Sequence, residues 1–361
     1  MIKGWYEVNN KRYFSKVEAL IAAKNDISKL NYFWQPEIWD HVDFTVEPTE
    51  SWDNLLKYRC LELREKYGWL QLFFSGGWDS TTILDTFVKH NIRLDEIIIF
   101  DRKFLTDPEI PTAIEYAKSI KKNFFPDIRL TILPVEYNFG DKFFAEHQDQ
   151  WIYNTHINMR YTRWMDRGSI FKYSDSYLKS ADQHKTSVGL IEGKDKPKLL
   201  LKDNDWYTFF VDSNTIDNSL SPIEDFYYSK TLPELHVKQL HMAINWFEQN
   251  INFINNQDYI HLVQSNKAPE SEYISYNIGI GRTCINNAHA QGGRMKSWHE
   301  NNINALQTQK VVAHEKSIDS RSWGIYVNGL YQVKELTNVD IFNQTIPDSI
   351  TEQRLVKRRT F

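Results

Sequence analysis

A short polar loop with two adjacent glycines stands between two apolar segments near residue 75. The loop and the residue after it read Ser75-Gly76-Gly77-Trp78-Asp79-Ser80-Thr81. Adjacent glycines let the backbone turn tightly and let a ligand approach the main chain. The side chains of Ser75, Ser80 and Thr81 add hydroxyl donors at the same place. This combination of residue types suits the binding of a pyrophosphate group.

The loop must be positioned by a strand before it and a helix after it. Residues 69–74 form an apolar run typical of a buried strand, and the segment from residue 78 to 90 carries apolar side chains at helical spacing. The first amides of a helix have no intrahelical partner and lie at the positive end of the helix dipole. We therefore expect an anion site where the loop meets the helix.

The loop sequence matches neither G-x-x-x-x-G-K-[ST] nor G-x-G-x-x-G. It resembles the S-G-G-x-D-S signature of the PP-loop superfamily of ATP pyrophosphatases, which includes the synthetase domain of asparagine synthetase. The resemblance implies that ATP and Mg²⁺ are bound and that ATP is cleaved to AMP and pyrophosphate. The nucleotide-binding residues that it implies are Phe74, Ser75, Gly76, Gly77, Asp79, Ser80, Thr81, Phe100, Asp101 and Gly193. The competing interpretation is a glycine-rich turn whose serines and aspartate are incidental.

Three further strands are predicted over residues 96–100, 128–134 and 187–193. One helix is predicted before the strand at 96–100 and another between the strands at 96–100 and 128–134. Strands that alternate with helices at this spacing indicate a parallel sheet. The expected fold is α/β, an open parallel sheet of about five strands with flanking helices, a small N-terminal cover and a mainly helical C-terminal region. Ligands of such sheets bind at the carboxyl ends of the strands, where the loop lies. In the PP-loop superfamily the end of the second strand contacts adenine, which implicates Phe100 and Asp101. The competing interpretation of this pair is a core phenylalanine followed by an aspartate at the edge.

A second group of charged residues follows the strand at residues 187–193. It reads Gly193-Lys194-Asp195-Lys196-Pro197. Loss of pyrophosphate requires cations, so Lys194 or Lys196 could neutralise the leaving group in the transition state. The carboxylates of Asp79 and Asp195 are the candidate ligands for Mg²⁺, which prefers oxygen. The competing interpretation is a solvated turn, because Lys, Asp and Pro all favour turns.

We expect three parts in the chain: residues 1–67, a cover of hairpin and helices; residues 68–220, the ATP-binding domain; and residues 221–361, a helical region with a terminal hairpin. In the cover we predict a hairpin over 1–14, a helix from 16 to 24, irregular structure over 31–50 and a helix from 52 to 67. In the C-terminal part we predict helices over 233–247 and 251–315 and a hairpin over 321–336. Ile2 stands where a fused glutaminase domain would need a cysteine, so we expect no ammonia from that route. Residues 233–241 also resemble a bacterial or phage-encoded group of asparagine-synthetase-like proteins.

The composition is that of a folded protein, with 41% hydrophobic and 25% charged residues. A net charge of −4 gives no overall attraction to nucleic acid, although a local basic patch remains compatible with it. Two cysteines, Cys60 and Cys284, fit a reducing compartment. We see neither a signal peptide nor an apolar run of membrane-spanning length. The expected location is therefore cytoplasmic, and no membrane partner is expected.

The predicted activity is that of an AMP-forming ligase, which activates a carboxylate or carbonyl oxygen of a small molecule or nucleobase for attack by a nitrogen nucleophile. Three alternatives remain. One is modification of a base in tRNA or DNA, with residues 139–183 and the basic tail at 354–361 as contacts. Another is sulfur transfer or sulfonucleotide chemistry at Cys284. The third is a regulatory protein that binds nucleotide without turnover.

Overall fold

The fold is described from a computed structural model. It describes residues 4–13, 16–24, 26, 29–101, 109–134, 187–193, 199–202, 205–208, 210, 223–249, 273–274 and 354–358. Among these residues, no helix is long and apolar enough to cross a membrane.

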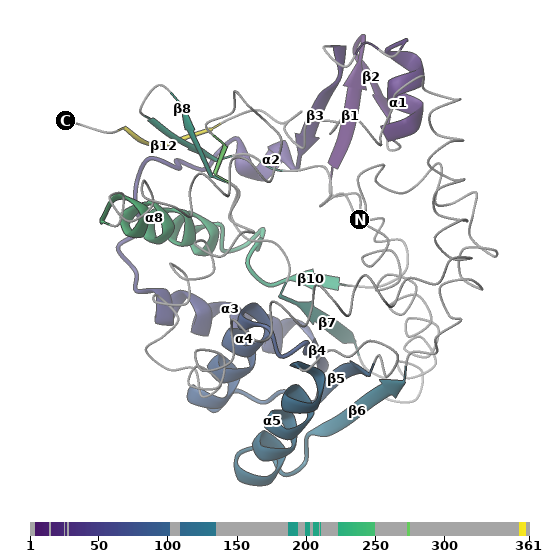
Figure 1. Ribbon diagram of the computed structural model, residues 1–361, viewed down its shortest axis with the longest axis vertical. Coiled ribbons are helices and arrows are strands. Elements are labelled where there is room, and N and C mark those ends of the chain that lie inside the picture. Colours follow the sequence, from purple (N-terminus) through teal and green to yellow (C-terminus); the bar gives the residue numbers. More distant parts are fainter. Residues whose placement is uncertain are drawn as a thin grey trace.

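A five-stranded parallel sheet forms the centre of the fold, in the strand order β10-β7-β4-β5-β6 (Figure 1). Its strands are β4 (Trp69–Phe73), β5 (Glu96–Asp101), β6 (Arg129–Pro134), β7 (Val188–Glu192) and β10 (Ile223–Asp225). All four pairs of neighbouring strands are parallel. The predicted α/β fold with a parallel sheet of about five strands is confirmed. Sequence patterns located four of these strands and missed β10.

Four helices belong to this part of the molecule. They are α3 (Trp52–Lys66), α4 (Trp78–Lys89), α5 (Glu109–Asn123) and α8 (Glu234–Gln249). Helix α3 begins where predicted, because the Ser51 hydroxyl accepts a hydrogen bond from the Asn54 amide over 3.2 Å. Helices α4 and α5 each connect two neighbouring strands of the sheet.

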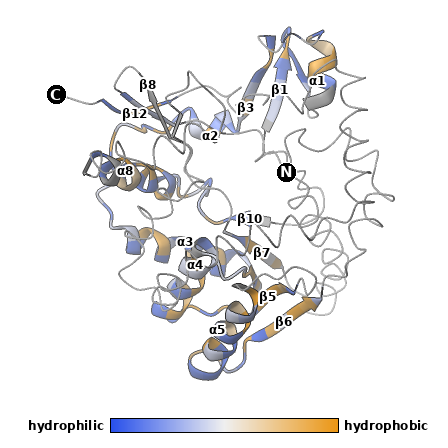
Figure 2. Cartoon of the chain, in the orientation of Figure 1, coloured by the Kyte–Doolittle hydropathy of each residue, from blue (hydrophilic) through white to orange (hydrophobic). Residues whose placement is uncertain are grey.

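Helices α3, α4 and α5 pack on one face of the sheet, whereas α8 packs against α3 and β12. Leu70 and Leu72 of β4 are fully buried in the same hydrophobic cluster as Ile83 and Phe87 of α4. The strands β5, β6 and β7 are predominantly hydrophobic (Figure 2). Strands β5 and β7 are buried on both faces for most of their length and read as continuous apolar runs, whereas the edge strand β6 is only partly buried.

The N-terminal part is a three-stranded antiparallel sheet in the order β2-β1-β3. Its elements are β1 (Gly4–Val8), β2 (Lys11–Tyr13), α1 (Lys16–Ala22), β3 (Asn31–Trp34) and α2 (Pro36–Trp39). The predicted hairpin is confirmed, and Asn9 and Asn10 at its turn have φ angles of 50° and 62°, as a two-residue hairpin turn requires. The prediction of irregular structure over 31–50 is wrong for β3 and α2. Proline suggested a break there, but it occupies the first turn of α2, where its missing N–H costs nothing.

A second antiparallel sheet has the order β11-β8-β9-β12. Its strands are β8 (Leu199–Lys202), β9 (Asp205–Thr208), β11 (Tyr273–Ile274) and β12 (Arg354–Arg358). Strands β8 and β9 form an antiparallel hairpin. The prediction of helices over 251–315 is wrong at β11, and the rest of that segment, like the hairpin predicted over 321–336, lies outside the described residues. The three-part division stays a prediction, although one hydrophobic cluster runs from Tyr6 to Val356 and β10 adds to the sheet from beyond residue 220.

Candidate nucleotide site

The glycine loop lies at the point where the strand order of the parallel sheet reverses. Strand β4 comes first in the chain and sits in the middle of the sheet, with β5 and β6 on one side and β7 and β10 on the other. The connections that leave β4 and β7 therefore diverge at their carboxyl ends. A crevice at such a switch point is where open α/β sheets bind their ligands.

The loop has the backbone geometry of a tight strand-to-helix turn. Gly76 has a φ angle of 75°, a conformation that favours glycine, and its backbone is buried. Gly77 is the N-cap of α4 with extended backbone, and its carbonyl accepts the first helical hydrogen bond from the Thr81 amide over 3.0 Å. The amides of residues 78–80 precede that bond, so they point outward at the positive end of α4.

The three hydroxyl groups of the loop have different surroundings. Ser75 is exposed, and its Oγ accepts a hydrogen bond from the Gly77 amide over 3.3 Å. Ser80 is buried and donates to the Gly77 carbonyl over 3.1 Å, with its Oγ also 3.3 Å from that of Ser75. Thr81 is buried, and its hydroxyl is 3.5 Å from the Gly76 carbonyl. Ser75 is thus placed to meet a ligand, while Ser80 and Thr81 brace the loop.

Gly193, at the end of β7, packs directly on the start of α4. A Cβ atom at residue 193 would lie 3.1 Å from the Ser80 amide nitrogen and 3.2 Å from the Asp79 carbonyl carbon. Both contacts are with backbone atoms, so a side chain at residue 193 would push β7 and α4 apart. The structure therefore brings together the two glycine motifs that the sequence singled out.

The end of β5 flanks the loop on the other side. Phe73 of β4 is in register with Ile98, and the Phe74 amide donates to the Ile98 carbonyl over 2.9 Å, so Phe100 and Asp101 lie level with the loop. The rings of Phe73 and Phe100 are 5.1 Å apart, and both are partly exposed. Phe74 is buried and contributes packing at this edge.

Tyr227 is a contact of the loop that sequence reasoning missed. Its hydroxyl donates a hydrogen bond to the Asp79 carbonyl over 3.0 Å, and its ring stacks on Trp52 with 6.2 Å between centroids. Burial, with the Asp79 carboxylate nearby, raises the pKa of Tyr227 well above its usual value. The phenol therefore stays protonated and remains a donor. No local pattern in the segment after β10 could reveal this contact.

Two carboxylates at the neighbouring strand ends were also missed. Glu192 ends β7 and Asp225 ends β10; the two are in register and both are buried. Since residues in register on parallel strands point to the same face, these carboxylates share one face of the sheet beside Gly193. The preceding apolar run of β7 was the only available sequence signal, and it indicated a strand rather than a site.

Arg59 of α3 fixes the chain that carries Asp225 and Tyr227. This buried guanidinium donates to the carbonyls of Asp225 and Phe226 over 3.3 and 3.2 Å. It also forms an ion pair with Glu224 at 3.0 Å. The segment after β10 is therefore held against α3 by the buried guanidinium of Arg59.

Several predicted site residues cannot be placed. Lys194, Asp195, Lys196 and Cys284 lie outside the described residues. Within the described part of the chain, no group of three His, Cys, Asp or Glu side chains is arranged to hold a metal ion. The roles of these residues, and of Asp79 as a metal ligand, stay predictions.

Polar side chains of α8 serve the packing of that helix. Lys238 forms an ion pair with Glu47 at 2.8 Å, and the His241 Nε2 is 2.9 Å from the Phe44 carbonyl oxygen. His236 is buried among aromatic rings, of which Tyr228 is 4.5 Å away between centroids. These contacts favour the interpretation of residues 233–247 as an amphipathic packing helix.

Two side chains of the basic tail also make structural contacts. Arg354 of β12 donates to the Trp39 carbonyl over 2.8 Å and pairs with Asp40. Lys357 forms an ion pair with Glu248 at 2.6 Å. These two side chains hold β12 in place, which leaves less of the tail to contact nucleic acid.

Comparison with known proteins adds no family to this description. Neither a scan against protein-family models nor a search of curated proteins found a match for the chain.

Proposed function

We propose that this protein is an AMP-forming enzyme of the PP-loop type. It binds ATP at the glycine loop, releases pyrophosphate, and activates a carboxylate or carbonyl oxygen of its acceptor for attack by a nitrogen nucleophile. The acceptor is a small molecule or a nucleobase. The observation that carries the proposal is the backbone contact between Gly193 and the first turn of α4, which joins the two glycine motifs at the switch point of the sheet.

The residues present fit a nucleotide with a divalent cation. The turn at Gly76 and Gly77 has little side-chain bulk, because the nearest atom to a Cβ added at Gly77 is the Ser75 Oγ at 3.2 Å. The helix dipole and the outward amides of residues 78–80 favour the phosphates. Asp79, in the first turn of α4, is our candidate ligand for Mg²⁺, together with Asp195.

The chain contributes binding, orientation and charge to the reaction. Bound Mg²⁺ would supply charge stabilisation for the departing pyrophosphate. Ser75 and the loop amides would orient the phosphates, and Lys194 or Lys196 would neutralise charge as the pyrophosphate leaves. Phe100 and Asp101 would border the adenine, since they flank the loop at the end of β5.

Pyrophosphate release in the presence of ATP and Mg²⁺ tests the proposal, with pools of carboxylates, amino acids, ammonia and nucleic acid as acceptors. Asp79→Asn should lower the rate about 100-fold or more while the melting temperature changes little, because Asp79 is half-buried at a helix start. Asp127→Asn is the matched control, since Asp127 is exposed just before β6, at the amino ends of the strands and away from the loop.

The outcome also separates the alternatives. ATP binding without pyrophosphate release under any acceptor would overturn the enzymatic proposal and favour a regulatory nucleotide-binding protein. Release that requires RNA or DNA would identify a nucleobase acceptor. Release that disappears in Cys284→Ser would favour sulfur chemistry.

A further inference from the structure

The N-terminal sheet carries an aromatic and cationic cluster on the face opposite α1. Side chains that alternate along its strands separate into two sets. Tyr6 and Tyr32 are buried with the residues of α1 in the main hydrophobic cluster. Trp5 precedes Tyr6 in sequence, and Phe33 follows Tyr32. The side chains of Trp5 and Phe33 are only partly buried and point to the opposite side of the sheet, which we call the outer face.

The rings on the outer face form a stacked pair. Trp5 and Phe33 are directly opposite in the antiparallel register of β1 and β3. Their ring centroids are 5.8 Å apart and their planes are inclined by 18°. The guanidinium of Arg12 lies over the Trp5 ring at 4.4 Å. The outer face therefore presents two aromatic rings and a planar cation side by side.

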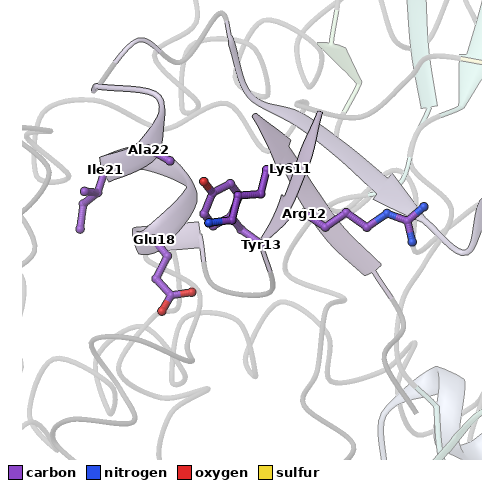
Figure 3. Close-up of a pocket in the computed structure, with 6 residues that line it drawn as sticks. All are labelled: Lys11, Arg12, Tyr13, Glu18, Ile21 and Ala22. Atoms are coloured by element: carbon purple, nitrogen blue, oxygen red, sulfur yellow. The ribbon is translucent and has the colours of Figure 1, made fainter. Parts of the chain in front are cut away.

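The charge of this region differs in sign from that of the whole chain. Residues 1–34 contain six Lys and Arg and three Asp and Glu, a formal charge of +3, whereas the complete chain has −4. Lys11 and Tyr13 line an open hollow of about 480 Å³ together with Glu18 of α1. Figure 3 shows Arg12 pointing away from α1. Cations thus flank β2 on both sides, and Glu7 is the carboxylate nearest to Arg12 in register.

We propose that the outer face of the β2-β1-β3 sheet binds single-stranded nucleic acid. Unpaired bases stack on aromatic side chains and on arginine, and an antiparallel sheet is a common platform for them. The cationic edge strand suits the phosphates. A duplex would not expose its bases to this platform. The proposal does not depend on the ATP chemistry above, because it uses none of the residues of the glycine loop.

Fluorescence anisotropy of labelled 12-nucleotide DNA and RNA single strands, with the full chain and without ATP, tests the proposal. We expect the dissociation constant to rise about tenfold or more in Trp5→Leu and in Arg12→Gln. Lys122→Gln removes a positive charge from an exposed position in the last turn of α5 and should change the dissociation constant by less than about twofold. Circular dichroism and thermal melting of each variant establish that the sheet is intact.

Three results would overturn the proposal. The first is no binding of either strand at low salt by the wild-type protein. The second is an equal loss of binding in Arg12→Gln and Lys122→Gln with none in Trp5→Leu, which would reduce the effect to general charge. The third is competition by poly-glutamate as strong as that by unlabelled single strand, which would indicate an acidic protein partner. Preference for DNA or RNA identifies the natural ligand, and absence of pyrophosphate release would leave this result unchanged.

Discussion

The phenol of Tyr227 donates a hydrogen bond to the backbone carbonyl of Asp79, although 148 positions separate the two residues in sequence. This bond ties the chain after β10 to the first turn of α4, the helix that begins at the glycine loop. The stack of Tyr227 on Trp52 fixes the ring, and Arg59 fixes the backbone just before it. The geometry of the loop therefore depends on a distant segment as well as on its own glycines.

Tyr227→Phe tests this dependence. The variant keeps the stacked ring but removes the donor, so we expect the free energy of unfolding to fall by about 1 kcal/mol. Pyrophosphate release should fall several-fold, because the first turn of α4 loses a constraint. Urea unfolding and the pyrophosphate assay measure the two effects. Tyr58→Phe on the exposed side of α3 should change neither quantity, and an unaltered Tyr227→Phe would show that the bond is dispensable.

Gly193→Ala should disturb the loop from the side of β7. The added Cβ would lie 3.1 Å from the Ser80 amide nitrogen, so β7 and α4 must separate by a few tenths of an ångström. We expect a loss of about 1–2 kcal/mol in stability and roughly tenfold weaker ATP binding, measured by calorimetry. Gly68→Ala is the control, because Gly68 is exposed and has no positive φ angle. Normal ATP affinity in Gly193→Ala would argue against a nucleotide at this contact.

Arg59→Met should be the most destabilising of these changes. It leaves Glu224 and two carbonyls without their buried donor, and breaking a buried ion pair from one side typically costs about 3–5 kcal/mol. Lys66 pairs with the same carboxylate at 2.6 Å but is exposed, so Lys66→Met should cost about 1 kcal/mol or less. Chemical unfolding of both variants measures the contrast. Equal losses would contradict the importance that we assign to Arg59.

The Arg59 pair also predicts a dependence on acid. Although burial favours the neutral acid, the charge of Arg59 and hydrogen bonds from Lys66 and Tyr67 lower the pKa of Glu224 to about 2. This depressed pKa stabilises the folded state fully above the ordinary value of 4.5, and the stabilisation is lost as pH falls toward 2. In Lys66→Met, which remains folded, we expect that acid-dependent loss to shrink only slightly, because Arg59 remains. If the stability of Lys66→Met did not change between pH 4.5 and pH 2, the lowered pKa of Glu224 would be due to Lys66 instead.

The stability of the folded protein should also depend on the protonation of His236, in a different pH range. Burial lowers the pKa of His236 to about 3 from its ordinary 6.5, and neither ring nitrogen has a hydrogen-bond partner among the residues that the structure describes. The unfolded chain therefore binds the proton more readily, and stability falls by about 1.4 kcal/mol per pH unit as pH drops from 6.5 toward 3. His236→Phe should flatten this part of the profile and be at least as stable as wild type at pH 7.

The control for that measurement is His41→Gln, because His41 is exposed. It should keep the slope of the wild-type protein between pH 3 and 6.5. A slope that persists in His236→Phe would place the responsible proton on another group.

The sequence predicted the elements whose signal is local. Ser51 marked the start of α3, Asn9 and Asn10 marked a hairpin turn, and the apolar runs of β4, β5 and β7 marked buried strands. Strand β10 has only three residues, too few for a periodic pattern, and its place in the sheet depends on pairing with β7. Strand β3 and helix α2 were missed because their proline and polar neighbours resemble a loop.

The candidate site divides in the same way. The turn at Gly76 and Gly77 could be predicted, because the glycines themselves permit it. Gly193 was implicated by the resemblance and by the strand before it, but its close approach to the backbone of Asp79 and Ser80 depends on the pairing of β7 with β4, which no local pattern indicates. The contact with Tyr227 could not be predicted, since only the packing of α3 against the segment after β10 brings it there.

The pairing of β12 with β9 has a consequence for synthesis on the ribosome. Strand β9 lies between β8, its immediate neighbour in sequence, and β12, which is translated much later. Until residues 354–358 emerge from the exit tunnel, the far edge of β9 keeps unpaired backbone groups, and buried Trp206 lacks part of its cover. A chain in which β12 has not yet paired would keep this edge of β9 open to pairing with other chains.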